Sequence, residues 1–439
     1  MPRPSALDEL MRRLTADDIA IIPGALETVR SNDTNHRYRQ SSDFYYLTNY
    51  DEPEAIAVIR PAHEEHPYIL FVRPRDAEKE VWDGTRAGVE GAKEIYGADE
   101  AFPIAEFEAK LPELLTGRDN LIYRLGTHSD LDHTIIKHLA LLRAMTRKGI
   151  VAPLTVTDTA KVIHEMRVIK TDDELKLIER AAQISAEAHV AAMKAVKPGM
   201  NEYEIEALVE YVFRKNGCEA PSYGSIVGGG NNATVLHYVK NDAQLKDGDL
   251  VLLDAGAEYK SYAGDITRTF PVSGKFTEAQ REIYELVLEA QTACVAGVRP
   301  GVSMDELYNL SVEILTAGMI RLGLLEGDAA KLIEEEAHKK FYMHKLGHFI
   351  GMDVHDVGAY YRDGKPRPLE AGIVVTIEPG LYIARDAENV PDKYRGIGIR
   401  IEDNVVVTTE GGRVLTGDVP KAVEEIEALM GGAKANAAH

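Results

Sequence analysis

The sequence has little cysteine and no long apolar run. Cys218 and Cys294 are the only two cysteines among 439 residues, and no CxxC spacing occurs, so neither a disulfide framework nor a thiolate metal site is expected. No stretch approaches the roughly 20 apolar residues of a membrane span. The N-terminal segment places charges and prolines where a signal peptide needs an apolar core. These absences predict a soluble protein of the cytoplasm, a reducing compartment.

Positive charge is also scarce. Lys and Arg number 50 against 71 Asp and Glu, which gives a formal net charge of -21. Nucleic acids and anionic membranes both require a positive footprint, so we expect no nucleic-acid partner and no membrane partner. Phosphate-binding motifs are missing as well, because the glycine run 228–230 is not followed by GK[ST].

The length of the chain exceeds that of one ordinary core and predicts two or three domains. The first part alternates helical and strand-like segments, which is typical of an α/β domain with helices covering a sheet. The expected elements are a helix over 7–14, strands over 18–23, 55–59 and 67–72, and a helix within 132–145.

A domain boundary is readable near residue 166. A charged connector is followed by Thr171-Asp172-Asp173-Glu174, a capping box that opens a long helix. We therefore predict an N-terminal α/β domain over 1–165, a catalytic domain over 166–430 and a disordered tail over 431–439.

The second part of the chain repeats itself weakly. Segments 196–212 and 298–315 each read as a helix end, a Pro-Gly break and a second helix, and segment 247–256 resembles 370–380. Each half carries two acids at matching places. Chance similarity is the alternative, but several matches in the same order favour a duplication with a pseudo-two-fold axis. The acids that would converge are Asp254, Asp265, Glu378 and Glu402.

The segment 250–270 reads as two apolar strands joined by a short turn. A turn centred on Tyr259 and Lys260 would place Asp254 directly opposite Asp265, with their side chains on one face. Two like charges on such apolar strands lose hydration and repel, so the arrangement requires a cation. The alternatives are that one aspartate caps a turn or that a bulge shifts the register.

A histidine-rich segment, 341–358, lies between the two acid pairs and contains His344, His348 and His355. It lacks the glutamate of an HExxH zinc site, and its glycines favour a loop or strand over a helix. Two interpretations remain open. Either one of these histidines binds a metal and the other two contact the substrate, or two of them bind a metal. Four carboxylates and an imidazole suit Mn²⁺, Co²⁺, Fe²⁺ or Zn²⁺, and bridging carboxylates suit two ions roughly 3.5–4 Å apart, as in hydrolytic centres.

Four long motifs in order identify a family resemblance. DAGAEYKSYAGDITRTF, HKLGHFIGMDVHD, EPGLY and YRGIGIRIED are similar to the creatinase/aminopeptidase "pita-bread" metallopeptidases, and among them to the Xaa-Pro aminopeptidases. The likeness extends to HRYRQSSDFYYLTNYDEPEA in the first domain, and so covers nearly the whole chain. The resemblance implies an α/β (α+β) protein with a creatinase-like N-terminal domain followed by a duplicated pita-bread catalytic domain.

The resemblance also implies an activity and its requirements. The expected substrates are peptides with proline at the second position. The expected cofactor is a pair of Mn²⁺ ions, with Co²⁺, Zn²⁺ or Fe²⁺ as alternatives. The expected assembly is a homo-oligomer, either a dimer or a tetramer. An Xaa-Pro dipeptidase (prolidase), which shares every ligand, is the nearest alternative, and a metal-free binding module on the same fold is a further one. Trp82, the only tryptophan, is expected by default to pack into a core. The resemblance implies an alternative, in which Trp82 reaches the site of a neighbouring subunit.

Site roles follow from the resemblance residue by residue. Glu378 would also shuttle the proton of the attacking water, and His237 and His355 would hold the substrate carbonyl and the oxyanion. Lys345 stands where many relatives have glycine, and its ammonium is expected to point to solvent. The implied metal ligands are Asp254, Asp265, His348, Glu378 and Glu402, with Asp265 and Glu402 bridging, and the implied proline pocket comprises His344, Tyr382 and Arg400.

Overall fold

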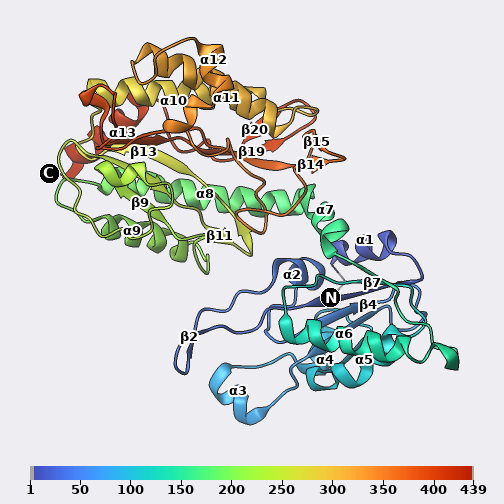
Figure 1. Ribbon diagram of the computed structural model, residues 1–439. Coiled ribbons are helices and arrows are strands. Elements are labelled where there is room, and N and C mark those ends of the chain that lie inside the picture. Colours follow the sequence, from blue (N-terminus) through green and yellow to red (C-terminus); the bar gives the residue numbers. More distant parts are fainter. Residues whose placement is uncertain (1–3, 438–439) are drawn as a thin grey trace. The chain divides into compact units, whose positions relative to one another are not determined.

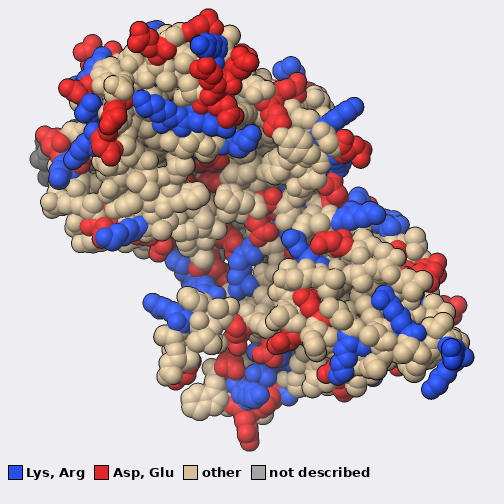
Figure 2. All heavy atoms as spheres, viewed as in Figure 1, with Lys and Arg blue, Asp and Glu red and all other residues tan. Residues whose placement is uncertain are grey.

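The computed structural model describes residues 4–437, and the chain divides between Met166 and Arg167 into two units, each with its own core (Figure 1). On the face drawn in Figure 2, acidic and basic side chains are interspersed over each unit, so the negative net charge is not gathered into one patch there. Among the described residues, no helix combines the length and apolarity that crossing a membrane requires.

A six-stranded mixed sheet organises the N-terminal unit. Its central strand β1 (Asp18–Pro23) runs antiparallel to β4 on one side and parallel to β7 on the other. The strand order is β6-β5-β4-β1-β7-β8, with β4 at Ile56–Ile59, β5 at Tyr68–Val72, β6 at Glu100–Pro103, β7 at Asn120–Ile122 and β8 at Thr155–Thr157.

Successive residues of β1 enter two separate cores, because side chains alternate across a strand. Ala20 and Ile22 pack in one core, and Ile19 and Ile21 in the other. The sheet is therefore covered on both faces, as the predicted α/β class requires. Helices α1 (Ser5–Arg13), α2 (Ser42–Thr48) and α4 (Gly88–Glu94) supply the first core, and α5 (Phe107–Leu115) and α6 (Ser129–Arg143) the second.

Helix α7 (Ile163–Val168) contains the division between the units, and the first helix that lies wholly in the second unit is the long α8 (Asp172–Ala195). The predicted capping box is confirmed, because Thr171 and Glu174 each bond the other's backbone N–H. Figure 1 shows α8 and α9 on one side of the central strands and α10 and α11 on the other. These helices are α9 (Glu202–Lys215), α10 (Glu278–Gly297) and α11 (Met304–Arg321), followed by the short α12 (Ala329–Glu334).

The predicted duplication is confirmed by the helices and by the strand pairing. Helices α9 and α11, the second helix of each half, both begin with a capping box, at Asn201 and Ser303. In each half an outer antiparallel pair encloses an inner two-stranded pair. The first half pairs β10 (Leu250–Asp254) with β13 (Thr267–Pro271) and β11 (Glu258–Tyr259) with β12 (Tyr262–Ala263); the second pairs β16 (Val374–Ile377) with β19 (Asp403–Val407) and β17 (Gly380–Ile383) with β18 (Ile397–Arg400).

The predicted register of the first hairpin is wrong by two residues. Asp254 lies opposite Thr267, not Asp265, because the turn is centred on Lys260 and Ser261. Both turn residues have positive φ, 48° and 66°, as a type I′ hairpin turn requires. A shift of two keeps every side chain on its original face, so Asp254 and Asp265 remain neighbours on a diagonal.

One further expectation differs from the structure, and the predicted disordered tail stays a prediction. Trp82 does not pack into a core: it lies on α3 (Ala77–Asp83) and is 86% exposed. Helix α13 (Val423–Ala437) extends into the segment 431–439 for which the sequence predicts a disordered tail, and residues 438 and 439 lie outside the described residues.

The pH dependence of folding should report on His189, which is fully buried on α8. Burial lowers the pKa of His189 to about 4, while its unfolded value is near 6.5. The unfolded chain therefore takes up this proton first, and stability present above pH 6.5 is lost as the pH falls toward 4, by on the order of 3 kcal/mol. In urea unfolding between pH 7 and 4, the free energy of unfolding of His189→Gln should lack this pH-dependent loss. An unchanged pH profile would contradict the assignment, and the exposed His133→Gln is the control.

Candidate metal centre and active site

A cavity of about 610 Å³ lies within the second unit and is lined by residues from both halves. Nine of the ten predicted site residues lie on its wall, and the tenth, Tyr382, is buried behind His344 and Arg400. The fold therefore brings together residues that are up to 165 positions apart, from 237 to 402. The nine on the wall are His237, Asp254, Asp265, His344, His348, His355, Glu378, Arg400 and Glu402.

The four acids occupy equivalent places in the two hairpins. Asp254 ends β10 and Glu378 directly follows β16, so each lies at the end of the first strand of its outer hairpin. Asp265 lies between β12 and β13, and Glu402 between β18 and β19. All four carboxylates therefore reach one space between the halves, as the sequence repeat predicts.

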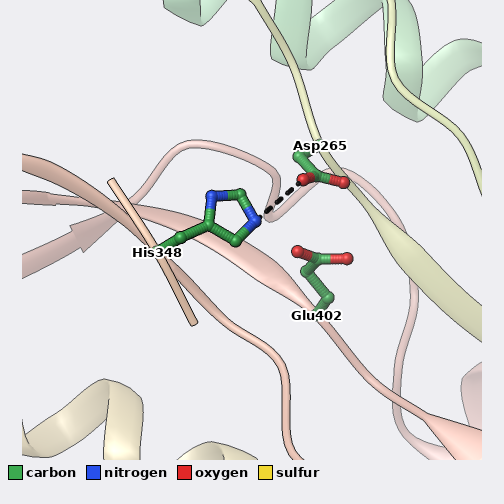
Figure 3. A group of neighbouring side chains, drawn as sticks. All are labelled: Asp265, His348 and Glu402. Carbon is green, nitrogen blue, oxygen red and sulfur yellow. Dashed lines mark ion pairs between the residues drawn. The ribbon is translucent and has the colours of Figure 1, made fainter. Parts of the chain in front are cut away.

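The tightest group consists of Asp265, His348 and Glu402, whose potential ligand atoms all lie within 4.8 Å of one another (Figure 3). His348 Nε2 is 3.5 Å from Asp265 Oδ2 and 3.4 Å from Glu378 Oε1. Its Nδ1 lies 3.0 Å from the Phe349 carbonyl oxygen, which only an N–H can satisfy. In the neutral ring this leaves the Nε2 lone pair directed at the carboxylates, the orientation of a metal-binding histidine.

Tyr223 is a site residue that the sequence reasoning missed. Its hydroxyl oxygen lies 2.5 Å from both Asp254 Oδ1 and Asp265 Oδ1. A phenol carries one proton and can donate to only one of these carboxylates at a time. No spacing pattern marks Tyr223, since its position depends on contacts with residues 31 and 42 positions away.

The electrostatics of the centre indicate a missing positive charge. Burial and neighbouring carboxylates raise the pKa of Asp265 and of Glu402, and burial raises the pKa of Glu378 to about 7. Burial would lower the pKa of His348, but Asp265 and Glu378 outweigh it and raise the value to about 9. Glu402 Oε1 is buried without a hydrogen-bond partner. A divalent cation would offset the repulsion between these carboxylates and bind the unpartnered oxygen, and such cations prefer an oxygen-rich set of donors.

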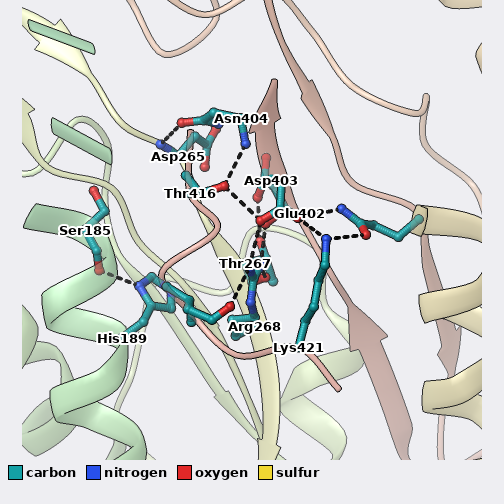
Figure 4. A network of polar contacts seen from close by, with 12 residues as sticks. Ser185, His189, Asp265, Thr267, Arg268, Glu402, Asp403, Asn404, Thr416 and Lys421 are labelled. Carbon is teal, nitrogen blue, oxygen red and sulfur yellow. Dashed lines mark hydrogen bonds and ion pairs between the residues drawn. The ribbon is translucent and has the colours of Figure 1, made fainter. Parts of the chain in front are cut away.

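Behind Glu402, a buried polar network joins the two halves (Figure 4). Arg268, on β13, donates through Nη2 to Asp403 Oδ1 at 2.7 Å and through Nη1 to the Glu402 carbonyl. Lys421 Nζ lies 2.6 Å from the other oxygen of Asp403. Thr267 donates to Glu402 Oε2 at 2.7 Å, and the Asn404 side chain accepts from the Asp265 amide at 3.0 Å. These bonds fix Asp265 and Glu402 relative to each other across the repeat.

A second chain of hydrogen bonds forms another part of the wall. Arg400 Nη2 lies 2.6 Å from Asp254 Oδ2, and its Nη1 donates to the Tyr382 hydroxyl at 3.0 Å. The Tyr382 oxygen is also 2.8 Å from His344 Nε2. Burial, together with the charge of Arg400, lowers the pKa of His344 to about 4, so this imidazole is neutral near pH 7. The predicted pocket residues are thus one connected unit that also holds Asp254.

Lys345 differs in part from the expectation. Its side chain is exposed, as predicted, but its Nζ lies 4.6 Å from the centre of the Tyr308 ring, in a cation–π contact with helix α11. The residue also lies on the cavity wall.

Glu202, at the start of α9, was also missed by the sequence reasoning. Its fully buried carboxylate accepts hydrogen bonds from the Gly229 and Ala243 amides at 2.7 and 2.8 Å, and from the Tyr238 hydroxyl at 2.8 Å. Gly229 ends strand β9 (Ile226–Gly229), and Tyr238 and Ala243 lie after it, in the loop that carries His237. A glutamate in the first helical turn is common, so its sequence position carries no signal of this role.

Two family models match the chain. The model described as "Metallopeptidase family M24" matches residues 176–409, and the model described as "Aminopeptidase P, N-terminal domain" matches residues 6–123. The chain is 47% identical to the Xaa-Pro aminopeptidase of Escherichia coli (strain K12), over 96% of this chain and 95% of that protein. It is 36% identical to Xaa-Pro aminopeptidase 3 of Homo sapiens, over 91% of this chain and 78% of that protein.

Solved structures agree with these matches. The aminopeptidase PepP of Pseudomonas aeruginosa superposes with a TM-score of 0.96 at 49% identity, covering 98% of this chain and 97% of that one. An Escherichia coli aminopeptidase P substituted with Zn and in complex with product superposes with a TM-score of 0.94 at 46% identity, covering 98% of this chain and 97% of that one.

Metal binding should stabilise the folded chain through Glu402. Mn²⁺ at 100 times its dissociation constant should add about 2.7 kcal/mol, because the unfolded chain lacks the assembled site. In Glu402→Gln, thermal unfolding with and without MnCl₂ should show little of this shift. The exposed Glu410→Gln is the matched control and should respond like the original chain. Equal stabilisation of both variants would exclude Glu402 as a ligand.

Proposed function

The chain belongs to metallopeptidase family M24 and, like its aminopeptidase P relatives, hydrolyses the bond between an N-terminal residue and a following proline; we propose that it does so in a two-metal centre loaded with Mn²⁺. The observation that supports the two-metal proposal is the convergence of four carboxylates and His348 on one cavity. Co²⁺, Zn²⁺ and Fe²⁺ suit the same donors.

Five residues would hold the ions. Asp265 and Glu402, one from each half, would be shared between the ions, Asp254 would be a ligand of one ion, and His348 and Glu378 would be ligands of the other. When bound, the ions lower the pKa of a water, so that a nucleophile exists at neutral pH, and offset negative charge that develops on the substrate. The buried oxygen of Glu402 without a hydrogen-bond partner and the raised pKa values of three acids support this donor set.

Glu378 would move the proton. Its side chain is only partly exposed, on the cavity wall, and Thr376 Oγ1 donates to Oε1 at 3.1 Å. One oxygen can bind a cation while the carboxylate accepts a proton from the attacking water. The same group then delivers the proton to the proline nitrogen, which must be protonated to leave.

His237 and His355 would bind the substrate carbonyl oxygen. Both are exposed on the cavity wall, on two separate loops. A ring N–H from each side would donate to the oxygen as it gains negative charge, which is where donors lower the barrier most.

The proline ring would lie against His344 and Arg400, with Tyr382 behind them. A neutral His344 suits a pocket for an uncharged ring, and the charge of Arg400 is already bound to Asp254. Leu236, Val239 and Val354 add apolar surface to the same cavity.

The two rival functions are weaker. Two relatives that match over 96% and 92% of this chain, at 47% and 45% identity, are Xaa-Pro aminopeptidases, so a dipeptidase is not favoured. A binding module would have no need of a complete set of ligands and proton-transfer groups in one cavity, and the chain is an enzyme by its relatives.

Location and assembly are part of the proposal. Both cysteines are buried and free, which supports a reducing compartment such as the cytoplasm. The exposed Trp82 and Val81 on α3 support a homo-oligomer, because large apolar side chains at 86% and 81% exposure favour burial against a partner.

Peptide length separates the aminopeptidase from the dipeptidase. With Mn²⁺ present, we expect release of arginine from Arg-Pro-Pro and little turnover of Gly-Pro, because an aminopeptidase must accommodate chain beyond proline. Steady-state kinetics on both peptides measure this. Turnover confined to the dipeptide would reject the proposal.

Replacement of the proton carrier should separate chemistry from binding. Glu378→Gln keeps the shape of the side chain but removes its proton affinity, so turnover of Arg-Pro-Pro should be lost while part of the bound Mn²⁺ remains by elemental analysis. The exposed Glu370→Gln is the matched control and should keep normal kinetics. Near-normal activity of Glu378→Gln would refute the assigned role.

A further inference from the structure

A buried ion cluster lies directly beneath the loop that carries His355. It consists of Asp356, the next residue along the chain, with Lys170 and Arg167 from the connector before α8. We propose that Lys170 and Arg167 position His355 for catalysis by fixing Asp356. This inference rests on the proposed role of His355 as a donor to the substrate carbonyl.

The two cations bind both oxygens of one carboxylate. Lys170 Nζ lies 2.8 Å from Asp356 Oδ2, and Arg167 Nη2 lies 2.6 Å from Oδ1. The three side chains are only 1 to 3% exposed. Because each oxygen has its own charged partner, the carboxylate can neither rotate nor shift without breaking a buried bond.

Stability alone does not explain the cluster. Taking charges out of water costs free energy, and apolar side chains of similar volume often stabilise a fold equally well or better. What an ion cluster adds is a defined geometry. Because Asp356 directly follows His355 in the chain, the cluster fixes the backbone next to the His355 side chain.

The loop is folded tightly around Asp356. The Asp356 amide donates to the Phe349 carbonyl at 2.9 Å, and the Gly351 amide donates to the Asp353 carbonyl at 3.1 Å. Gly351 has no room for a side chain, because a Cβ there would lie 2.2 Å from Asp356 Oδ2. Arg167 Nη2 also lies 2.7 Å from Asp353 Oδ2, so the cation holds the loop at two points.

The cluster also connects the loop to the metal-binding hairpins. The Lys170 amide donates at 2.9 Å to the carbonyl of Gly372, just before β16, the strand that delivers Glu378. The Gly351 carbonyl accepts from the Ala263 amide of β12 at 2.8 Å. At the end of this loop the His355 ring stands edge to face against His348, with ring centres 4.4 Å apart. His355 is thus placed relative to both halves of the centre.

The loop carrying His237 is held differently, by the carboxylate of Glu202. Lys170 and Arg167 should therefore affect His355 and not His237. This difference provides an internal control within one enzyme.

A double-mutant cycle on the Mn²⁺-loaded enzyme tests the proposal with Arg-Pro-Pro as substrate. Lys170→Met should lower kcat by about 10- to 100-fold, the effect of a small misplacement of a catalytic group, with KM and bound Mn²⁺ unchanged. His355→Ala and His237→Ala should each lower kcat by roughly 10²–10³. Adding Lys170→Met to His355→Ala should cause no further loss, whereas adding it to His237→Ala should cause the full loss. Lys170→Arg should recover most of the activity, and the exposed Lys176→Met is the matched control.

The outcomes are distinguishable. Equal losses in both histidine backgrounds, or loss of bound Mn²⁺ with Lys170→Met, would overturn the positioning role and leave His355 in place. A normal kcat in His355→Ala would instead refute the proposed role of His355. Should Lys170→Met not fold, Lys170→Gln, which retains a donor to Asp356, enters the same cycle with the same expected coupling.

Discussion

The structure depends on concentrating negative charge where water is largely excluded. Asp265 and Glu402 are 5% and 1% exposed and share one space with Asp254 and Glu378. Neutral hydrogen-bond donors do not satisfy all of these carboxylate oxygens. Tyr223 has one proton for two carboxylates, and one oxygen of Glu402 has no hydrogen-bond partner. Such a cluster is costly without a cation, and with one it becomes a site for hydrolysis.

The duplicated hairpins make this concentration possible. In each half, one acid lies at the end of the first strand of the outer pair and the other lies shortly before the second strand, so two pairs of acids form a group of four carboxylates where the halves meet. The bonds across the repeat, from Thr267 to Glu402 and from the Asp265 amide to Asn404, set the distance between them. Neither hairpin could hold this geometry alone.

Much of this architecture could be predicted from sequence, because it is encoded locally. The β-rich run of β1, the capping box at Thr171 and the repeated acid spacing all depend on nearby residues. The hairpin register failed because Lys260 and Ser261 adopt positive φ, which residues other than glycine rarely do. The prediction that Asp254 and Asp265 lie close together is still correct, because a register shift of two residues keeps both side chains on the same face of the hairpin. Tyr223 and Glu202 were missed because their roles consist of contacts with residues 27 to 42 positions away, which no local pattern records.

Buried charges recur beside the site residues, each in a cluster of its own. Asp403, bound by Arg268 and Lys421, adjoins Glu402; Asp356, bound by Lys170 and Arg167, adjoins His355; and Arg400 binds Asp254 directly. Buried ion pairs offer little stability over apolar packing, so their placement requires another reason. Charged hydrogen bonds are short and directional, and they hold a backbone segment more narrowly than apolar contacts do. The fold therefore uses ionic clusters where the position of a neighbouring group matters most, and apolar packing elsewhere.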